Sequence, residues 1–189
     1  PMKVRIMLVQ ILLYNENNQH KEIIHLVTKN LPKYSRFESL IYSRAMAHEA
    51  LKNIPEMEKD LQHILSIDSR NSVALNALGY SLLINTERYD EAYNYISKAL
   101  EYDPGNYAIL DSMGWVLYKK GDFNNALYYI ESAYNKNQDP EIIEHYCEVL
   151  LKNGLYEKSL EVMKSAIEDN PENLKLLKKL TALHKNVSF

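Results

Sequence analysis

Hydrophobic residues recur at spacings of three and four along almost the whole chain, and polar residues occupy the positions between them. This spacing is the period of one helix face, whereas a half-buried strand would alternate strictly between apolar and polar residues. Only 5 glycines and 6 prolines interrupt the 189 residues, so the breaks between elements are short. The pattern predicts an all-α fold.

The same pattern repeats along the chain at an interval of about 34 residues. In each copy, small residues stand where two helix axes would approach closely, and large apolar residues stand where the space between helices must be filled. Each copy therefore predicts a pair of antiparallel helices. The first copy consists of Leu75, Leu78, Gly79, Leu82, Ala92, Ile96, Ala99 and Pro104; the second of Leu110, Met113, Gly114, Leu117, Ala126, Ile130 and Ala133; the third of Ile143, Tyr146, Cys147, Leu150, Ser159, Met163, Ala166 and Pro171.

These copies organise the chain as one continuous solenoid. A terminal repeat with a polar outer face is expected to cap such an array, and the last helix, 172–185, has Leu174, Leu177, Leu180 and Leu183 on one stripe. The expected segments are a degenerate helical pair at 1–37 (helices 4–14 and 19–30), a weaker repeat at 38–71, clear repeats at 72–105, 106–139 and 140–171, and the capping helix within 172–189.

The repeated residues resemble the tetratricopeptide signature, strongly over 72–171 and weakly over 38–71. The resemblance implies a right-handed superhelical solenoid that binds a partner protein or peptide in a concave groove. Residues 74–80, 88–92 and 108–115 look more specifically like bacterial tetratricopeptide proteins that include outer-membrane lipoprotein adaptors of carboxy-terminal processing proteases. That narrower resemblance implies a scaffold that presents a protease or its substrates in the bacterial envelope, with a periplasmic or outer-membrane-tethered location.

In this family, the first helix of each repeat lines the groove with its second, fifth, ninth, twelfth and thirteenth residues. Asn76 and Asp111 occupy fifth places, where they would hydrogen-bond a peptide backbone, or else belong to a solvated polar face or make a local helix contact. The resemblance thus implies a groove that is aromatic in the middle and acidic toward the C-terminus. The groove residues expected on this basis are Asn76, Tyr80, Leu83, Asp111, Trp115, Tyr118, Lys119, Glu144 and Glu148.

Trp115 is the only tryptophan and stands in a ninth place. A large aromatic side chain in a concave surface buries much area at low entropic cost, so Trp115 is expected to be an exposed hot spot. Its replacement by alanine would then weaken partner binding about tenfold or more without unfolding the chain. The alternative is that Trp115 packs against a neighbouring helix and completes the core.

Charge and composition exclude several other functions. The 22 basic and 25 acidic residues give a net charge of -3, which is unlike the basic surface of a nucleic-acid-binding protein. The only cysteine, Cys147, cannot form an internal disulfide and fills a small-residue place of the repeat. The apolar run 4–14 is too short for a membrane span. Because the sequence starts at Pro1, we expect it to be a processed or truncated piece of a longer protein.

No constellation of residues predicts an enzyme or a cofactor. None of the six histidines has another at the i, i+4 spacing that places two imidazoles on one metal ion. Glu141, Glu144 and Glu148 share one helix face, an arrangement far more typical of a solvated face than of paired catalytic carboxylates. The competing hypothesis to an adaptor is a solenoid that associates with itself through tyrosines of its second helices, namely Tyr93, Tyr95, Tyr128, Tyr129 and Tyr134.

Overall fold

The computed structural model describes residues 2–185, which form eleven α-helices and no β-strand. The predicted all-α fold is confirmed. Pro1, the basis for expecting a truncated chain, lies outside the described residues. The helices are α1 (Met2–Glu16), α2 (His20–Tyr34), α3 (Glu38–Ala50), α4 (Ile54–Ile67), α5 (Ser72–Asn85), α6 (Tyr89–Tyr102), α7 (Tyr107–Lys119), α8 (Phe123–Tyr134), α9 (Pro140–Lys152), α10 (Tyr156–Asp169) and α11 (Leu174–Lys185).

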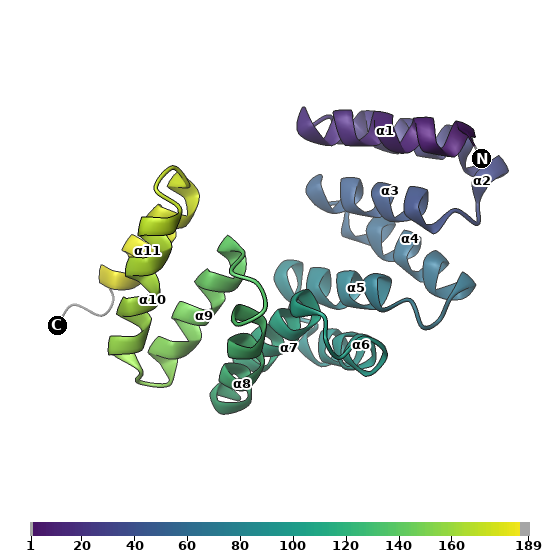
Figure 1. Cartoon of the computed structure of the whole chain (residues 1–189). Helices are drawn as coiled ribbons and strands as arrows, with labels where there is room; N and C mark the ends of the chain where they lie inside the picture. The colour runs from purple at the N-terminus through teal and green to yellow at the C-terminus, as the bar shows by residue number, and fades with distance from the viewer. Residues whose placement is uncertain (1, 186–189) are drawn as a thin grey trace. The chain divides into compact units, whose positions relative to one another are not determined.

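The chain divides into two compact units, an N-terminal unit Pro1–Tyr102 and a C-terminal unit Asp103–Phe189. In the N-terminal unit, α1 packs with α2, α3 with α4, and α5 with α6 (Figure 1). The pairs are stacked in chain order, because α3 also packs on α2 and α5 also packs on α4. We call α1, α3, α5, α7 and α9 first helices, and their partners second helices.

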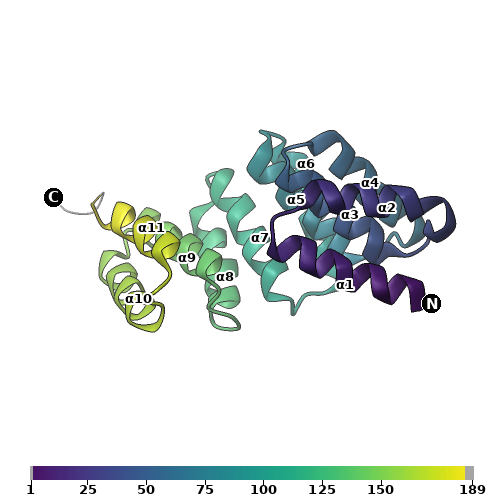
Figure 2. The same cartoon turned by 90° about the horizontal axis from the view of Figure 1, so that it is seen from above.

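The C-terminal unit continues this construction with the pairs α7–α8 and α9–α10 (Figure 2). Here the first helices α7 and α9 also contact each other, and α11 packs against both α9 and α10. The helix α11 thus takes the place that the first helix of a further repeat would occupy. The inner face of this unit, which we define as the side formed by α7, α9 and α11, holds most of the predicted groove residues.

The core of each pair consists of the residues that define the repeat. The helical members of all three copies are buried. The glycines among them are required for close approach, because a Cβ atom on Gly114 would lie 2.3 Å from Ile130 Cγ1, and one on Gly79 would lie 2.6 Å from Ile96 Cγ1. The positions of small and large residues in the sequence therefore reflect a steric constraint between the two helices of a pair.

Four of the five turns inside the pairs, all except the α5–α6 turn, share one backbone feature within the described residues. Gly121 and Gly154 have φ values of +85° and +72°, the left-handed conformation that ends many helices. Asn18 and Lys52 adopt the same conformation, with φ values of 54° and 59°, after α1 and α3. The degenerate N-terminal segment and the weak repeat thus turn in the same way as the pairs α7–α8 and α9–α10, although their sequences match the signature poorly.

The prediction for the last helix is wrong in two details. The helix begins at Leu174 instead of residue 172, because the Asn173 side chain accepts a hydrogen bond from Leu176 N at 3.1 Å and so caps the helix there. Its buried residues are Leu176 and Leu180, whereas Leu174 is exposed. The buried stripe is therefore rotated relative to the predicted stripe of four leucines.

The apolar run near the start forms part of a packed helix. Val4, Met7 and Ile11 of α1 form a core cluster with residues of α2 and α3, among them Ile23 and Leu40. None of the helices within residues 2–185 is both long and apolar enough to cross a membrane.

Candidate partner-binding surface

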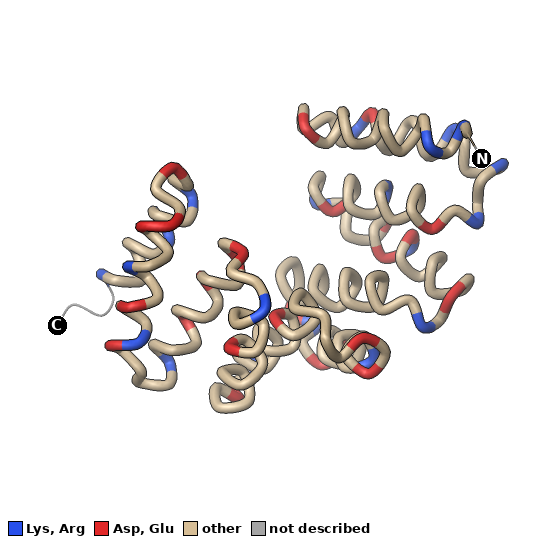
Figure 3. Tube along the Cα trace, viewed as in Figure 1, with Lys and Arg blue, Asp and Glu red and all other residues tan. Residues whose placement is uncertain are grey.

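In the N-terminal unit, α5 is a helix without a single charged residue (Figure 3). Its Leu75, Leu78 and Leu82 face the core, while Val73 and Ile84 on the other side remain 52% and 48% exposed. A helix that is apolar on both faces is usually buried all round. We call this side of α5, which points away from the core, its inner face; it is an apolar surface without the charges that normally cover a solvated helix face.

The predicted groove residues of α5 lie at different depths. Asn76 and Tyr80 are partly buried, and Leu83 is buried, so Leu83 is not open to a partner as the prediction requires. The Oδ1 atom of Asn76 is buried and has no hydrogen-bond partner among residues 2–185. Such an acceptor is costly to leave unpaired, and a side-chain rotation would bring it to the surface, where a donor of a partner could satisfy it.

A hollow of about 400 Å³ opens beside α5. Tyr42 of α3 lies in its wall, and burial, reinforced by the negative charge of Glu49, raises the pKa of the Tyr42 hydroxyl above 10.0. That hydroxyl therefore stays protonated and can donate a hydrogen bond at neutral pH. The lining residues are Leu8, Glu38, Ser39, Tyr42, Ser43, Ile64, Asn71 and Val73.

The C-terminal unit contains a buried acid–imidazole pair that the sequence analysis missed. His145 Nδ1 of α9 lies 3.0 Å from Oδ1 and 2.9 Å from Oδ2 of Asp111 on α7, and donates to this carboxylate. Burial raises the pKa of the Asp111 carboxyl, and the hydrogen bond from His145 opposes that shift. Asp111 is therefore occupied by a neighbouring helix, as in the alternative of a local contact, and is not open to a peptide.

Trp115 is packed against the same histidine. Its ring stacks on His145 at 3.9 Å between centroids and on Tyr118 at 4.7 Å, and Lys119 Nζ lies 4.5 Å from its centroid. Only 7% of Trp115 is exposed. The expectation of an exposed tryptophan hot spot is wrong, because His145 from the next repeat covers the ring.

Tyr118, Lys119 and Glu148 form the accessible edge of this cluster. Tyr118 and Glu148 are partly exposed, and Lys119 is exposed. Burial, together with the charge of Glu148 and a hydrogen bond to it, raises the pKa of Tyr118 to about 12. The edge thus offers an aromatic ring and one charge of each sign to a partner.

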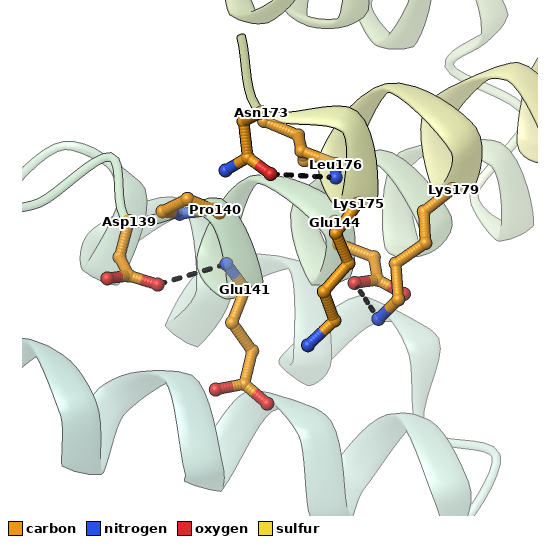
Figure 4. A pocket seen from close by; sticks show the side chains of 8 residues that line it. All are labelled: Asp139, Pro140, Glu141, Glu144, Asn173, Lys175, Leu176 and Lys179. Atoms are coloured by element: carbon orange, nitrogen blue, oxygen red, sulfur yellow. Dashed lines mark hydrogen bonds and ion pairs between the residues drawn. The ribbon is translucent and has the colours of Figure 1, made fainter. Parts of the chain in front are cut away.

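A second hollow, of about 240 Å³, lies between the start of α9 and α11 (Figure 4). Glu144 pairs with Lys179 of α11, and Lys175 lies beside them. Asp139 caps α9 by accepting a hydrogen bond from Glu141 N at 3.0 Å. Glu144, a predicted groove residue, therefore lines a hollow, but its carboxylate is already neutralised by a lysine. The other lining residues are Pro140, Asn173 and Leu176.

Two signals in the sequence point to the contacts that the prediction missed. His145 follows Asp111 by 34 residues, and Lys179 follows Glu144 by 35. One repeat length separates residues on first helices that lie side by side. Complementary residues one repeat length apart in the sequence therefore identify contacts between neighbouring first helices.

The chemistry of the remaining candidates is that of packing. Cys147 is buried, and burial raises the pKa of its thiol to about 12, so it is a poor nucleophile at neutral pH. Among residues 2–185, no group of three or more His, Cys, Asp or Glu side chains is placed to hold a metal ion. Of the five tyrosines considered for self-association, Tyr128 is exposed and the other four are partly buried.

Comparison with known proteins agrees with this architecture. Residues 73–106 match the family model described as tetratricopeptide repeat. The TPR repeat-containing protein PA4667 of Pseudomonas aeruginosa is 34% identical over 142 residues, which are 75% of this chain and 24% of that protein. The chain therefore spans about a quarter of the length of this curated relative.

Solved structures show the same fold at low sequence identity. The thermophilic TPR protein TTC0263 of Thermus thermophilus has a TM-score of 0.82 at 16% identity, with 95% of this chain and 97% of that chain covered. YrrB, described as a TPR protein with an unusual peptide-binding site, has a TM-score of 0.62 at 18% identity, with 89% and 87% covered. The chain thus contains a tetratricopeptide repeat and has the fold of tetratricopeptide solenoids.

Proposed function

We propose that this chain is a non-catalytic scaffold that holds a segment of another protein on the inner sides of its first helices. The observation that carries the proposal is the uncharged helix α5, with Val73 and Ile84 about half exposed, beside a hollow of about 400 Å³. A partner that covers these side chains gains the free energy of removing apolar area from water. The peptide-binding site named for YrrB, which shares this fold, supports the same kind of role.

Polar groups beside α5 favour an extended peptide as the bound segment. The protonated Tyr42 hydroxyl donates to a backbone carbonyl, and the amide of the partly buried Asn76 accepts a backbone N–H once a side-chain rotation brings its buried Oδ1 to the surface. Apolar pockets with a few placed polar groups fix both the affinity and the direction of a peptide. We therefore expect a partner segment with apolar side chains at the positions that meet Val73 and Ile84.

In the C-terminal unit, the proposed contact residues are the accessible ones of the predicted set. Tyr118, Lys119 and Glu148 form the edge that a partner meets, and Trp115 supports this edge from below through its stacking on Tyr118. Glu144 takes part only if a partner cation replaces Lys179. A basic side chain in the bound segment would do so, since an arginine forms two hydrogen bonds with a carboxylate where lysine forms one.

The narrower role implied by the sequence resemblance is to present a carboxy-terminal processing protease or its substrates in a bacterial envelope. We include it in the proposal on the strength of residues 74–80, 88–92 and 108–115. A protease among the proteins captured by the immobilised chain would support this narrower role. Capture of other proteins alone would contradict it and leave the scaffold proposal intact.

Capture experiments with surface variants test the scaffold proposal. Val73→Glu places a charge on the apolar side of α5 and is expected to weaken partner binding about tenfold or more, or about 1.4 kcal/mol. Tyr128→Glu is the matched control, because Tyr128 is 67% exposed on the second helix α8. The result that overturns the proposal is equal capture by Val73→Glu, Tyr128→Glu and the unchanged chain, with identical circular dichroism showing that all three are folded.

A further inference from the structure

Helix α1 is hydrophobic on two opposite faces. One face, formed by Val4, Met7 and Ile11, is buried against the next helices. The other face is bare and includes large apolar side chains that are between 52% and 75% exposed. The bare face consists of Met2, Ile6, Val9, Leu12 and Leu13.

This face of α1 lacks the covering helix that the neighbouring first helices have. In the N-terminal unit, α3 is covered by α2 of the preceding pair, and α5 by α4. Within residues 2–185, helix α1 packs mainly on α2 and α3, which lie on its buried side, and it forms an edge of the unit in both views (Figures 1 and 2). A contiguous apolar patch of this kind marks an interaction site. Its spacing, with Met2, Ile6, Val9 and Leu13 along one line, is that of a helix packed against another helix.

The charges of α1 indicate what kind of helix covers it. Lys3 and Arg5 lie at its N-terminal end and Glu16 at its C-terminal end, and the first turn has no acidic residue. This order is unfavourable for the helix itself, whose dipole places partial positive charge at the N-terminus and negative charge at the C-terminus. A second helix of the same sequence in antiparallel orientation would bring its Glu16 to the cationic end, and its cations to the acidic end.

The positions of the charges make this pairing specific. Arg5 and Glu16 are separated by eleven residues, about three helical turns or roughly 16 Å, so they lie on the same edge of the bare face at opposite ends. About a two-fold axis near the middle of the helix, Arg5 of each copy meets Glu16 of the other, and Val9 meets Leu12. A parallel arrangement would instead place like charges together.

We propose that the bare face of α1 is a homodimer interface, in which α1 of a second copy packs antiparallel with Arg5–Glu16 ion pairs at both ends. The contact is isologous, because each copy contributes the same patch. It uses α1 and leaves α5 available, so dimerisation and the proposed partner binding are separate properties of the chain.

Light scattering of the chain over a range of concentrations tests the proposal. The unchanged chain is expected to be a dimer that dissociates on dilution. Val9→Glu, which places a carboxylate at the centre of each apolar patch, is expected to weaken dimerisation at least about tenfold. Because Val9 is more than half exposed, this change leaves the helix content unaltered. Tyr128→Glu, equally polar but on α8, should dimerise like the unchanged chain.

Charge reversal separates the antiparallel dimer from other modes of association. Arg5→Glu alone and Glu16→Arg alone each create two like-charge contacts per dimer and should weaken it. A mixture of the two single variants restores both opposite-charge contacts, and so does the double variant on one chain. The proposal is overturned if the unchanged chain is a monomer, or if neither combination restores the dimer.

Discussion

The pairs α5–α6 and α7–α8 lie in different units and share the same core but not the same inner face. Their core places carry equivalent residues, and all are buried. At the fifth and ninth places of the first helices, α5 presents Asn76 and Tyr80, both partly buried. The same places in α7 hold Asp111 and Trp115, and both are buried. Equivalent places in a repeat therefore predict equivalent surroundings in the core, but not on the inner face.

The difference arises from His145, which has no counterpart in the repeat pattern. His145 lies on α9, the neighbouring first helix. Its ring stacks on Trp115, and it donates a hydrogen bond to Asp111. Core places are determined by contacts that recur within every pair, whereas inner-face places depend on the individual residues of the adjacent repeat. A single side chain on α9 thus converts two expected binding residues of α7 into structural ones.

The largest expected effect comes from replacing the side chain at the ninth place of each first helix, Trp115 or Tyr80, by alanine. Trp115→Ala is expected to lower the free energy of unfolding of the C-terminal unit by about 3 to 5 kcal/mol, because it leaves a cavity beside His145. Alkylation of Cys147 measures opening of this unit alone, since the thiol is buried with a pKa of about 12. Tyr80→Ala should cost less and leave Cys147 protected. Equal stability of both variants would show that Trp115 is not a structural residue.

The fifth places provide the next test. Asp111→Ala is expected to cost about 1 to 3 kcal/mol in unfolding free energy, because it leaves the buried His145 ring without its acceptor. Asn76→Ala should not lower stability, since the Asn76 Oδ1 has no partner within residues 2–185 to lose and its removal relieves the cost of an unpaired acceptor. Urea denaturation of the two variants measures both effects. A larger loss at Asn76 than at Asp111 would reverse the comparison.

The glycines test the part of the comparison in which the pairs are alike. A Cβ on Gly79 lies 2.9 Å from Ala92 O, and one on Gly114 lies 3.0 Å from Ala126 O, in addition to the isoleucine contacts. Overpacking costs about 1 to 3 kcal/mol, and alanine recovers up to about 1 kcal/mol of helix propensity. Both alanine variants should therefore lose about 1 to 2 kcal/mol in urea denaturation. Gly105→Ala is the control, because no atom lies within 4 Å of its added Cβ; a loss confined to one pair would contradict the shared core.

The fold could be predicted from the sequence because the repeat is enforced by sterics. Wherever two helix axes approach closely, the sequence shows a small residue such as Gly79 or Gly114, and the order of sizes alone identifies the pairs. The turns of the weak N-terminal segments lack the glycine signal of the later repeats, because Asn18 and Lys52 adopt there the left-handed conformation that Gly121 and Gly154 adopt later in the chain. The fold class was therefore predictable, but the weak match of the N-terminal segments did not show that their turns have the same backbone conformation as the α7–α8 and α9–α10 turns.

The candidate surface was predictable only in part. The first helices supply its residues, as the resemblance implies for the groove, but depth is decided by neighbours that a repeat position does not specify. Trp115 is covered by His145, and Glu144 is neutralised by Lys179 of the capping helix. The partners of His145 and Lys179, Asp111 and Glu144, precede them by 34 and 35 residues, so both contacts are visible in the sequence only when complementary pairs at that interval are sought.

The smallest test concerns the second helices, where the place after the buried isoleucine is Ser97 in α6 and Glu131 in α8. Ser97 Oγ is buried without a partner among the described residues. Glu131 Oε1 accepts hydrogen bonds from Lys158 Nζ at 2.5 Å and from Tyr146 Oη at 2.8 Å. The Lys158 hydrogen bond, followed by that of Tyr146, lowers the pKa of the Glu131 carboxyl below its ordinary value of 4.5.

A lowered pKa in the folded state means that the ionised form of Glu131 stabilises the fold. This contribution is present above pH 4.5 and is lost as the pH falls through the lowered value. Because Glu131 and Lys158 are 39% and 49% exposed, solvent screening limits it to about 1 kcal/mol or less. Glu131→Gln should therefore be less stable than the unchanged chain at neutral pH, and the difference should shrink on acidification and in high salt. Ser97→Ala should show no such dependence; a Glu131→Gln difference that is constant with pH would mean that the carboxylate contributes through packing and not through its charge.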